Sequence, residues 1–151
     1  MAAEPQSDLA VGFIMGVAYR KIASLLQHRL KSFDITPEQW SVLNQIDQAD
    51  GLIQKDIADR TGKDKPTTTR IIDLLENKGL VRKQTGKQDR RSFLVYSTER
   101  GQALIRETEP IEQGVTEEVK RIMSPDEYGK LLELLQRINK HLSDQTDLDP
   151  S

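Results

Sequence analysis

The sequence predicts a mainly α-helical fold with a small β-hairpin. Apolar residues recur at helical three-and-four spacing over most of the chain, from Leu9 to Leu142. Two short β-type runs, 80–85 and 92–97, flank a polar loop that carries three cations. A helical pattern that stops at Gly79 comes directly before them. A helix followed by a basic-tipped hairpin is the layout of a winged helix-turn-helix, in which the helix lies in a DNA major groove and the wing reaches a minor groove.

Composition limits the other functions that the chain can have. Its 151 residues suffice for one domain with helical extensions. Because there is no cysteine, a disulfide scaffold, a thiol sensor and a cysteine nucleophile are excluded. His28 and His141 lie far apart and lack close His or Cys companions, so we predict no metal site and no cofactor. The apolar run 9–19 is too short to span a bilayer and follows no basic segment, which predicts a cytoplasmic protein without a membrane partner.

The charge is distributed unevenly along the chain. The net charge is -2, but the segment 51–98 holds 11 Lys or Arg against 6 Asp or Glu, a balance of +5. The remainder holds 11 basic and 18 acidic residues, a balance of -7. Such asymmetry is typical of a polyanion-binding module on an acidic support.

The two ends of the chain predict long helices that pair with a second subunit. We expect residues 1–7 to be disordered, 8–35 and 99–142 to be dimerisation helices, and 143–151 to be a frayed tail. The first helix has an apolar stripe wider than one small domain needs: Phe13, Ile14, Val17, Ala18, Ile22, Leu25, Leu26 and Leu30. The C-terminal pattern starts at a Thr98 cap, is interrupted near Pro110 and restarts at Ser124. Its apolar positions include Ala103, Leu104, Val115, Leu131, Leu135 and Leu142.

The segment 36–98 predicts the winged domain. Thr36, Pro37 and Gln39 form a helix start with a capping box, and Trp40, Val42, Leu43 and Ile46 follow as core residues. The short step 51–53 is expected to add one strand to the hairpin. A short helix over 54–60, with Ile57 and Ala58 facing inward, then ends at Thr61-Gly62.

The next helix is the candidate recognition helix. It begins at about Lys65, with Asp64 as cap and Pro66 in the first turn. Spacing directs Thr68, Ile71, Ile72 and Leu75 to the core. The outer face then keeps mostly short polar side chains whose hydroxyls can reach phosphates or base edges, although they could equally be only solvated. This face comprises Pro66, Thr67, Thr69, Arg70, Asp73 and Asn77.

Nine residues are the candidate DNA contacts. The helix provides Lys65, Pro66, Thr67, Thr69 and Arg70, and the wing provides Lys87, Asp89, Arg90 and Arg91. The alternative for Arg90 and Arg91 is an ordinary solvated charged turn.

Two stretches carry a resemblance to the MarR family of bacterial winged-helix regulators. The family's wing signature, Asp-x-Arg, five residues, then Leu-Thr, is similar to 89–98, with Ser97 where the family usually has Leu. The segment 69–81 is similar to the recognition helix and its exit, and the likeness runs from about Leu9 to Leu142. It implies a homodimer with interleaved terminal helices on a pseudo-palindromic operator. It also implies that Arg91 enters the minor groove with Asp89 orienting it.

The same resemblance implies a repressor released from DNA by a small ligand, with a site for aromatic acids between the dimer helices and the winged domain. The candidates by residue type are Trp40, Phe13, Phe33, His28 and Arg20, and core packing is the alternative for the aromatic ones. An enzyme is not expected, because Gly62-Lys63 lacks the upstream glycine of a phosphate-binding loop and no Ser, His and carboxylate cluster is visible. A winged-helix protein-interaction module that never binds DNA remains the competing hypothesis.

Overall fold

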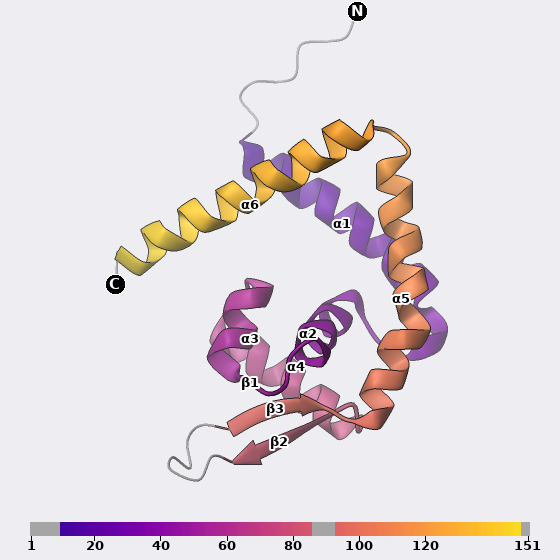
Figure 1. The fold of residues 1–151 in the computed structure, drawn as a ribbon, viewed down its shortest axis with the longest axis vertical. Coiled ribbons are helices and arrows are strands. Elements are labelled where there is room, and N and C mark those ends of the chain that lie inside the picture. The colour runs from indigo at the N-terminus through magenta and orange to yellow at the C-terminus, as the bar shows by residue number, and fades with distance from the viewer. Residues whose placement is uncertain (1–9, 86–92, 149–151) are drawn as a thin grey trace, which may run out of the picture. The chain divides into compact units, whose positions relative to one another are not determined.

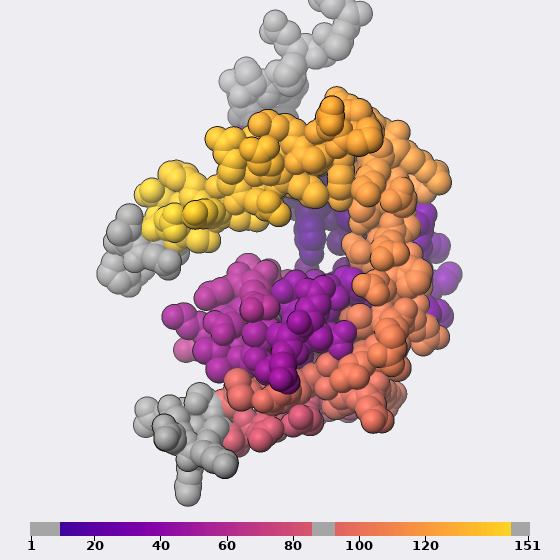
Figure 2. Space-filling view, in the orientation of Figure 1, coloured from indigo at the N-terminus to yellow at the C-terminus, as the bar shows by residue number. Residues whose placement is uncertain are grey.

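A computed structural model describes residues 10–85 and 93–148, drawn as a ribbon in Figure 1 and as a space-filling view in Figure 2. The chain divides into two compact units, residues 1–112 and 113–151. The predicted fold class is confirmed: helices dominate and one small antiparallel sheet forms the wing. In order, the elements are α1 (Val11–Arg29), the 3-10 helix η1 (Lys31–Phe33), α2 (Pro37–Asp47), β1 (Leu52–Ile53), α3 (Gln54–Thr61), α4 (Lys65–Asn77), β2 (Val81–Thr85), β3 (Phe93–Ser97), α5 (Glu99–Lys120) and α6 (Pro125–Leu148).

The core of the first unit lies between α2, α3, α4 and the sheet. The predicted inward face of α4 is confirmed, since Thr68, Ile71, Ile72 and Leu75 are all buried. Fully buried aliphatic side chains from the other elements complete this core: Leu30, Val42, Leu43, Ile46, Ile57 and Val95. The outer face of α4 is therefore the side that the core leaves available.

Local capping sets the start of α2, the end of α3 and the start of α4, as predicted. Thr36 and Gln39 form the reciprocal capping box of α2, with the Gln39 N–H 3.1 Å from the Thr36 hydroxyl. Asp64 caps α4 by accepting from the Thr67 N–H at 2.8 Å. Gly62 ends α3 at φ 66°, a left-handed conformation that favours glycine. Only two residues, Lys63 and Asp64, therefore separate Gly62 from the start of α4.

The sheet has the order β1-β3-β2. The prediction that the step after Gly51 pairs with the hairpin is confirmed, because Leu52 lies opposite Val95. At the base of the wing, Val81 lies opposite Ser97, and the Ser97 hydroxyl donates to the Asp47 carboxylate of α2 at 2.9 Å. The serine at this position therefore has a polar partner rather than an apolar one.

Three boundary predictions are wrong. The first helix ends at Arg29, and η1 and a left-handed Asp34 (φ 52°) follow it. Helix α5 runs through Pro110 without interruption, because Pro110 is exposed and water can satisfy the Arg106 carbonyl that loses its N–H partner. Helix α6 continues past Leu142 to Leu148, since no Gly or Pro occurs between Leu142 and Pro150 to stop it.

Both terminal helices expose apolar side chains. In α1 only Leu26 is buried, and Phe13 is 57% exposed. In α6 no residue is buried over 125–145, the part of that helix whose burial is described, and Leu142 is 55% exposed. None of the helices in the described part of the chain has the length and apolarity needed to cross a membrane.

A buried polar contact ties α2 to α5. The pattern predicted Ala103 and Leu104 as inward positions, but the structure buries Ile105 and Thr108 instead and exposes Ala103. The Trp40 indole N–H donates to the Thr108 hydroxyl at 2.8 Å, and Thr108 itself donates to the Leu104 carbonyl at 2.7 Å. A hydroxyl suits this position because its oxygen accepts from the indole N–H while its own hydrogen is donated to a backbone carbonyl.

We expect Thr108→Val to destabilise the fold by about 1–3 kcal/mol, because it leaves the buried indole N–H without an acceptor. Thr61→Val is the matched control, since Thr61 also donates to a carbonyl four residues back, that of Ile57, at 2.7 Å. The control should cost less than about 1 kcal/mol, the typical net value of one hydrogen bond. Urea unfolding followed by circular dichroism measures both. Equal losses in the two variants would contradict the role of the indole contact.

Candidate nucleic-acid interface

The outer face of α4 presents the predicted helix residues together. Pro66, Thr69 and Arg70 are exposed, Lys65 is exposed at the helix start, and Thr67 is half-buried. A shallow surface of the helix is lined by Pro66, Thr69, Arg70, Asp73, Leu74 and Asn77. Short side chains on this face allow a helix to approach base edges closely.

A lysine on the wing neutralises two acids of α4. The Lys83 ammonium of β2 lies 2.5 Å from the Asp73 carboxylate and 3.5 Å from that of Glu76. The hydrogen bond to Asp73 raises the pKa of Lys83 above its usual value. Because both carboxylates would otherwise repel phosphate, this pairing leaves Arg70 as the exposed cation among the residues lining the α4 surface. Sequence reasoning missed Lys83, although its place on the strand after α4 was visible.

Thr69 is held by a residue that sequence reasoning also missed. Its hydroxyl donates to the Lys65 carbonyl at 2.9 Å and accepts from the Gln54 side-chain amide at the start of α3. With its hydrogen engaged inside the helix, the hydroxyl has an acceptor lone pair to offer a base or a sugar. Gln54 thus shares the polar surface at the N-terminal part of α4.

The stem of the wing stacks cations on aromatic rings. The Arg82 guanidinium lies 4.3 Å from the centroid of the Tyr96 ring, and the Lys83 ammonium lies 5.1 Å from that of Phe93. The predicted wing contacts Lys87, Asp89, Arg90 and Arg91 lie outside the described residues.

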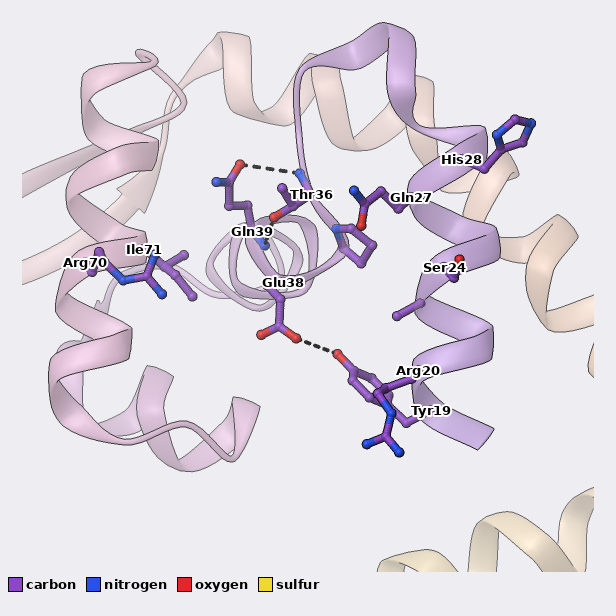
Figure 3. A pocket seen from close by; sticks show the side chains of 12 residues that line it. Tyr19, Arg20, Ser24, Gln27, His28, Thr36, Glu38, Gln39, Arg70 and Ile71 are labelled. Atoms are coloured by element: carbon purple, nitrogen blue, oxygen red, sulfur yellow. Dashed lines mark hydrogen bonds between the residues drawn. The ribbon is translucent and has the colours of Figure 1, made fainter. Parts of the chain in front are cut away.

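A pocket of about 780 Å³ lies beside α4 (Figure 3). Its walls come from α1, α2 and α4, with Tyr19, Arg20, Ala23, Ser24, Gln27, His28, Thr36, Pro37, Glu38, Gln39, Arg70 and Ile71. Gln27 and Arg70 point into it from opposite sides, whereas the His28 ring points away from its centre. Arg70 therefore lies at the border between this pocket and the outer face of α4.

Of the five predicted effector candidates, only two line this pocket. Arg20 and His28 line the pocket. Trp40 does not line it, because its ring is buried against Thr108. Phe33 belongs to a different cavity beside Arg100, and Phe13 is exposed on α1. Three aromatic candidates are thus outside the pocket, while Tyr19, which the sequence reasoning did not single out, lines it.

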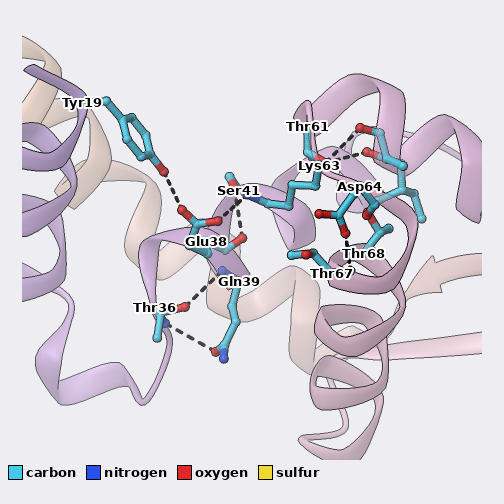
Figure 4. A network of polar contacts seen from close by, with 12 residues as sticks. Tyr19, Thr36, Glu38, Gln39, Ser41, Thr61, Lys63, Asp64, Thr67 and Thr68 are labelled. Atoms are coloured by element: carbon cyan, nitrogen blue, oxygen red, sulfur yellow. Dashed lines mark hydrogen bonds and ion pairs between the residues drawn. The ribbon is translucent and has the colours of Figure 1, made fainter. Parts of the chain in front are cut away.

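Glu38 is the hub of a polar network between α1, α2 and the α3–α4 turn (Figure 4). One oxygen accepts from the Tyr19 hydroxyl at 2.8 Å, and the other pairs with the Lys63 ammonium. These hydrogen bonds, first that of Lys63 and then that of Tyr19, lower the pKa of Glu38. Burial and the bond to Glu38 raise the pKa of Tyr19 to about 12.

These shifts define the pH range of the network. The lowered pKa of Glu38 means that its contribution is present above the ordinary value of 4.5 and is lost as the pH falls through the folded-state pKa. The raised pKa of Tyr19 means that its contribution is present below the ordinary value of 10.0 and is lost as the pH rises towards about 12. The network is therefore intact at neutral pH.

No group of three His, Cys, Asp or Glu side chains that could hold a metal ion occurs within residues 10–85 and 93–148. What this part of the chain offers a ligand is a polar helix face with an exposed cation and an adjoining pocket that both polar and apolar side chains line. Such an arrangement binds and positions partners through hydrogen bonds and charge.

Comparisons with known proteins agree with this geometry. Residues 33–92 match the family model described as MarR family. The apo structure of wild-type MarR from E. coli is similar to this chain, with 27% identity, coverage of 86% of this chain and 97% of that chain, and a TM-score of 0.70.

Two further solved structures share the fold. One is an S. aureus MepR–DNA complex, at 24% identity, with 89% of this chain and 99% of that chain covered and a TM-score of 0.79. The other concerns the regulation of DNA binding of Bordetella bronchiseptica BpsR by 6-hydroxynicotinic acid, at 24% identity, with 91% and 97% covered and a TM-score of 0.79.

Proposed function

Because this chain belongs to the MarR family of winged-helix regulators, we propose that it is a sequence-specific DNA-binding transcriptional regulator rather than an enzyme. The observation that carries the proposal is the outer face of α4, where Lys65, Pro66, Thr67, Thr69 and Arg70 lie together on the side away from the core. We place α4 in a major groove, with the wing residues Lys87, Asp89, Arg90 and Arg91 at the neighbouring minor groove. Because its partner is chromosomal DNA, the same proposal includes a cytoplasmic location.

The proposed active form is a homodimer. The apolar side chains that α1 and α6 expose in the single chain give each helix a face for a second subunit. Segments 8–35 and 99–142 would then serve as the dimerisation helices and 36–98 as the DNA-binding domain. Two such domains related by two-fold symmetry would bind a pseudo-palindromic operator.

The proposed mode of control is repression that a small aromatic acid relieves. The 780 Å³ pocket supports it, because that volume suits a small molecule and Arg20 and Arg70 can pair with a carboxylate. The BpsR structure, with 6-hydroxynicotinic acid as regulator, provides the chemical precedent in the same fold. A ligand carboxylate bound to Arg70 would compete with DNA for this cation.

The experiment that tests DNA binding compares Arg70→Ala with Lys87→Ala on a duplex selected from a random pool and on unselected DNA. If Arg70 contacts a base edge, its loss should cost about 1–3 kcal/mol on the selected duplex and relax preference at one position in each half-site. If Lys87 contacts only phosphate, its loss should weaken both DNAs about equally and lower the salt slope by about one unit per contact. Fluorescence anisotropy over a salt titration measures both.

Arg137→Ala, an exposed cation of α6, is the control and should leave both affinities unchanged. Equal losses on both DNAs for Arg70→Ala would make Arg70 a phosphate contact and transfer base reading to Thr67, Thr69 or Pro66. If the unmodified protein shows no salt-dependent binding to any duplex, the winged-helix protein-interaction module becomes the better hypothesis.

A further inference from the structure

We propose that Glu38 is a positioning residue for DNA binding, which with Tyr19 and Lys63 fixes the α3–α4 turn, and hence the start of α4, relative to α1. This inference rests on the proposed function, because DNA binding is one of its readouts. We call the three side chains the Glu38 brace (Figure 4). It assigns a role to residues that lie outside the expected DNA contacts.

The Glu38 brace joins three separate elements. The two carboxylate oxygens of Glu38 have different partners: the Tyr19 hydroxyl of α1 at 2.8 Å and the Lys63 ammonium of the α3–α4 turn. Glu38 itself lies in the first turn of α2, directly after the Pro37 that starts the helix. Since α2 is anchored in the core, Glu38 gives the other two elements a common fixed point.

Lys63 lies in the turn between the last residues of α3 and the cap of α4. Its backbone N–H donates to the Ala58 carbonyl of α3 at 3.1 Å, and the next residue, Asp64, caps α4. The side chain of Lys63 is only 13% exposed, although it is charged. Because the turn is short, a displacement of Lys63 displaces Asp64 and the first residues of α4, including Thr67.

Tyr19 fixes α1 at a point far from the buried residues that anchor this helix. The buried apolar anchors at this end of the chain, Leu26 and Leu30, lie at the C-terminal end of α1 and just after it. Tyr19 lies about two turns earlier, where the helix is otherwise mostly exposed. Contacts of partly exposed side chains contribute little to global stability, but they can set the angle between a helix and a domain. In a dimer built on α1, that angle sets the distance between the two copies of α4.

The brace also borders the pocket, because Tyr19 and Glu38 both line it. Arg70, on the recognition helix, adds to the electrostatic stabilisation of the Glu38 carboxylate. The same carboxylate therefore interacts with α1, with the turn and with Arg70 on the outer face of α4. A molecule that entered the pocket would contact the brace directly.

The test uses the full-length protein with Tyr19→Phe, which removes one hydroxyl, and Glu38→Gln, which removes the charge at constant size. The matched controls are Tyr128→Phe and Glu133→Gln in α6. Hydrogen exchange of the free protein reports on the turn over 62–64. Anisotropy reports affinity for a selected duplex and for duplexes with half-sites one base pair closer or farther apart.

We expect faster exchange of the turn in Tyr19→Phe and Glu38→Gln, with melting temperature and dimer unchanged. Affinity for the natural spacing should fall by about 2- to 30-fold, and the preference for that spacing over the altered ones should shrink. The controls should match the unmodified protein.

Unchanged exchange in the turn for both variants overturns the proposal whether or not DNA binds. A loss of affinity that is equal at all spacings also overturns it, because the distance between the two copies of α4 would then not depend on the brace. If the unmodified protein binds no duplex while exchange responds as expected, the DNA-binding function fails, and with it the role of Glu38 in that function, although the brace itself stands.

Discussion

Leu131→Glu is expected to separate the two subunits and to abolish operator binding. Leu131 is 37% exposed in the single chain and lies in the apolar stripe of α6. No residue of α6 over 125–145, where burial is described, is buried. Helices of this kind gain most of their stability from a covered apolar face, so the exposed stripe needs a partner. A carboxylate placed in that interface would be desolvated twice, once in each subunit of a symmetric dimer.

The expected loss in the free energy of dimerisation is large. Burying one leucine stabilises by about 1.5–3 kcal/mol, and an unpaired buried charge costs more. Two copies together should cost about 4 kcal/mol or more, which raises the dimer dissociation constant about a thousandfold. Because the proposed function places one domain on each half-site, operator affinity should fall with the dimer.

Light scattering at micromolar concentration checks this result. The unmodified protein should have twice the 17.2 kDa chain mass, and Leu131→Glu should be monomeric or unfolded. Gln136→Glu adds the same charge on α6 outside the stripe and should remain a dimer that binds the operator. A folded monomer of the unmodified protein at this concentration would refute the dimer.

The parts of the fold that were predictable from sequence are those with local causes. The capping box at Thr36, the cap at Asp64 and the stop at Gly62 all involve residues within a few positions of one another. The inward face of α4 followed from helical spacing alone. Sequence motifs of this kind predict structure because the interacting groups are neighbours along the chain.

The parts that were missed depend on contacts between distant residues. Lys83 neutralises Asp73 across an α4–β2 contact, and Trp40 needs Thr108 from α5. Glu38 reads in the sequence as one acid in the first turn of a helix, which is an ordinary preference. Only the fold shows that its two oxygens connect α1 to the turn before α4. The wing-tip contacts stay predictions.

A glycine near the start of α5 also depends on a contact between distant residues. Gly101 lies in the first turn of α5, where its N–H donates to the Thr98 hydroxyl at 3.1 Å. Sequence rules would favour alanine there, because glycine within a helix costs about 0.5–1 kcal/mol relative to alanine. The structure predicts the opposite. A Cβ at this position would lie 2.1 Å from the carbonyl oxygen of Leu80, the residue that enters β2.

We therefore expect Gly101→Ala to destabilise the fold by about 3 kcal/mol, the upper part of the range for overpacking. The clash has no cheap relief, because the Leu80 carbonyl is backbone and already accepts the Thr98 N–H at 3.0 Å. Gly12→Ala and Gly129→Ala are matched controls, since nothing lies within 4 Å of a Cβ at either position, and they should be neutral or stabilising. Urea unfolding compares the three variants. A Gly101→Ala protein as stable as the two controls would show that α5 does not pack against the Leu80 backbone as closely as this structure has it.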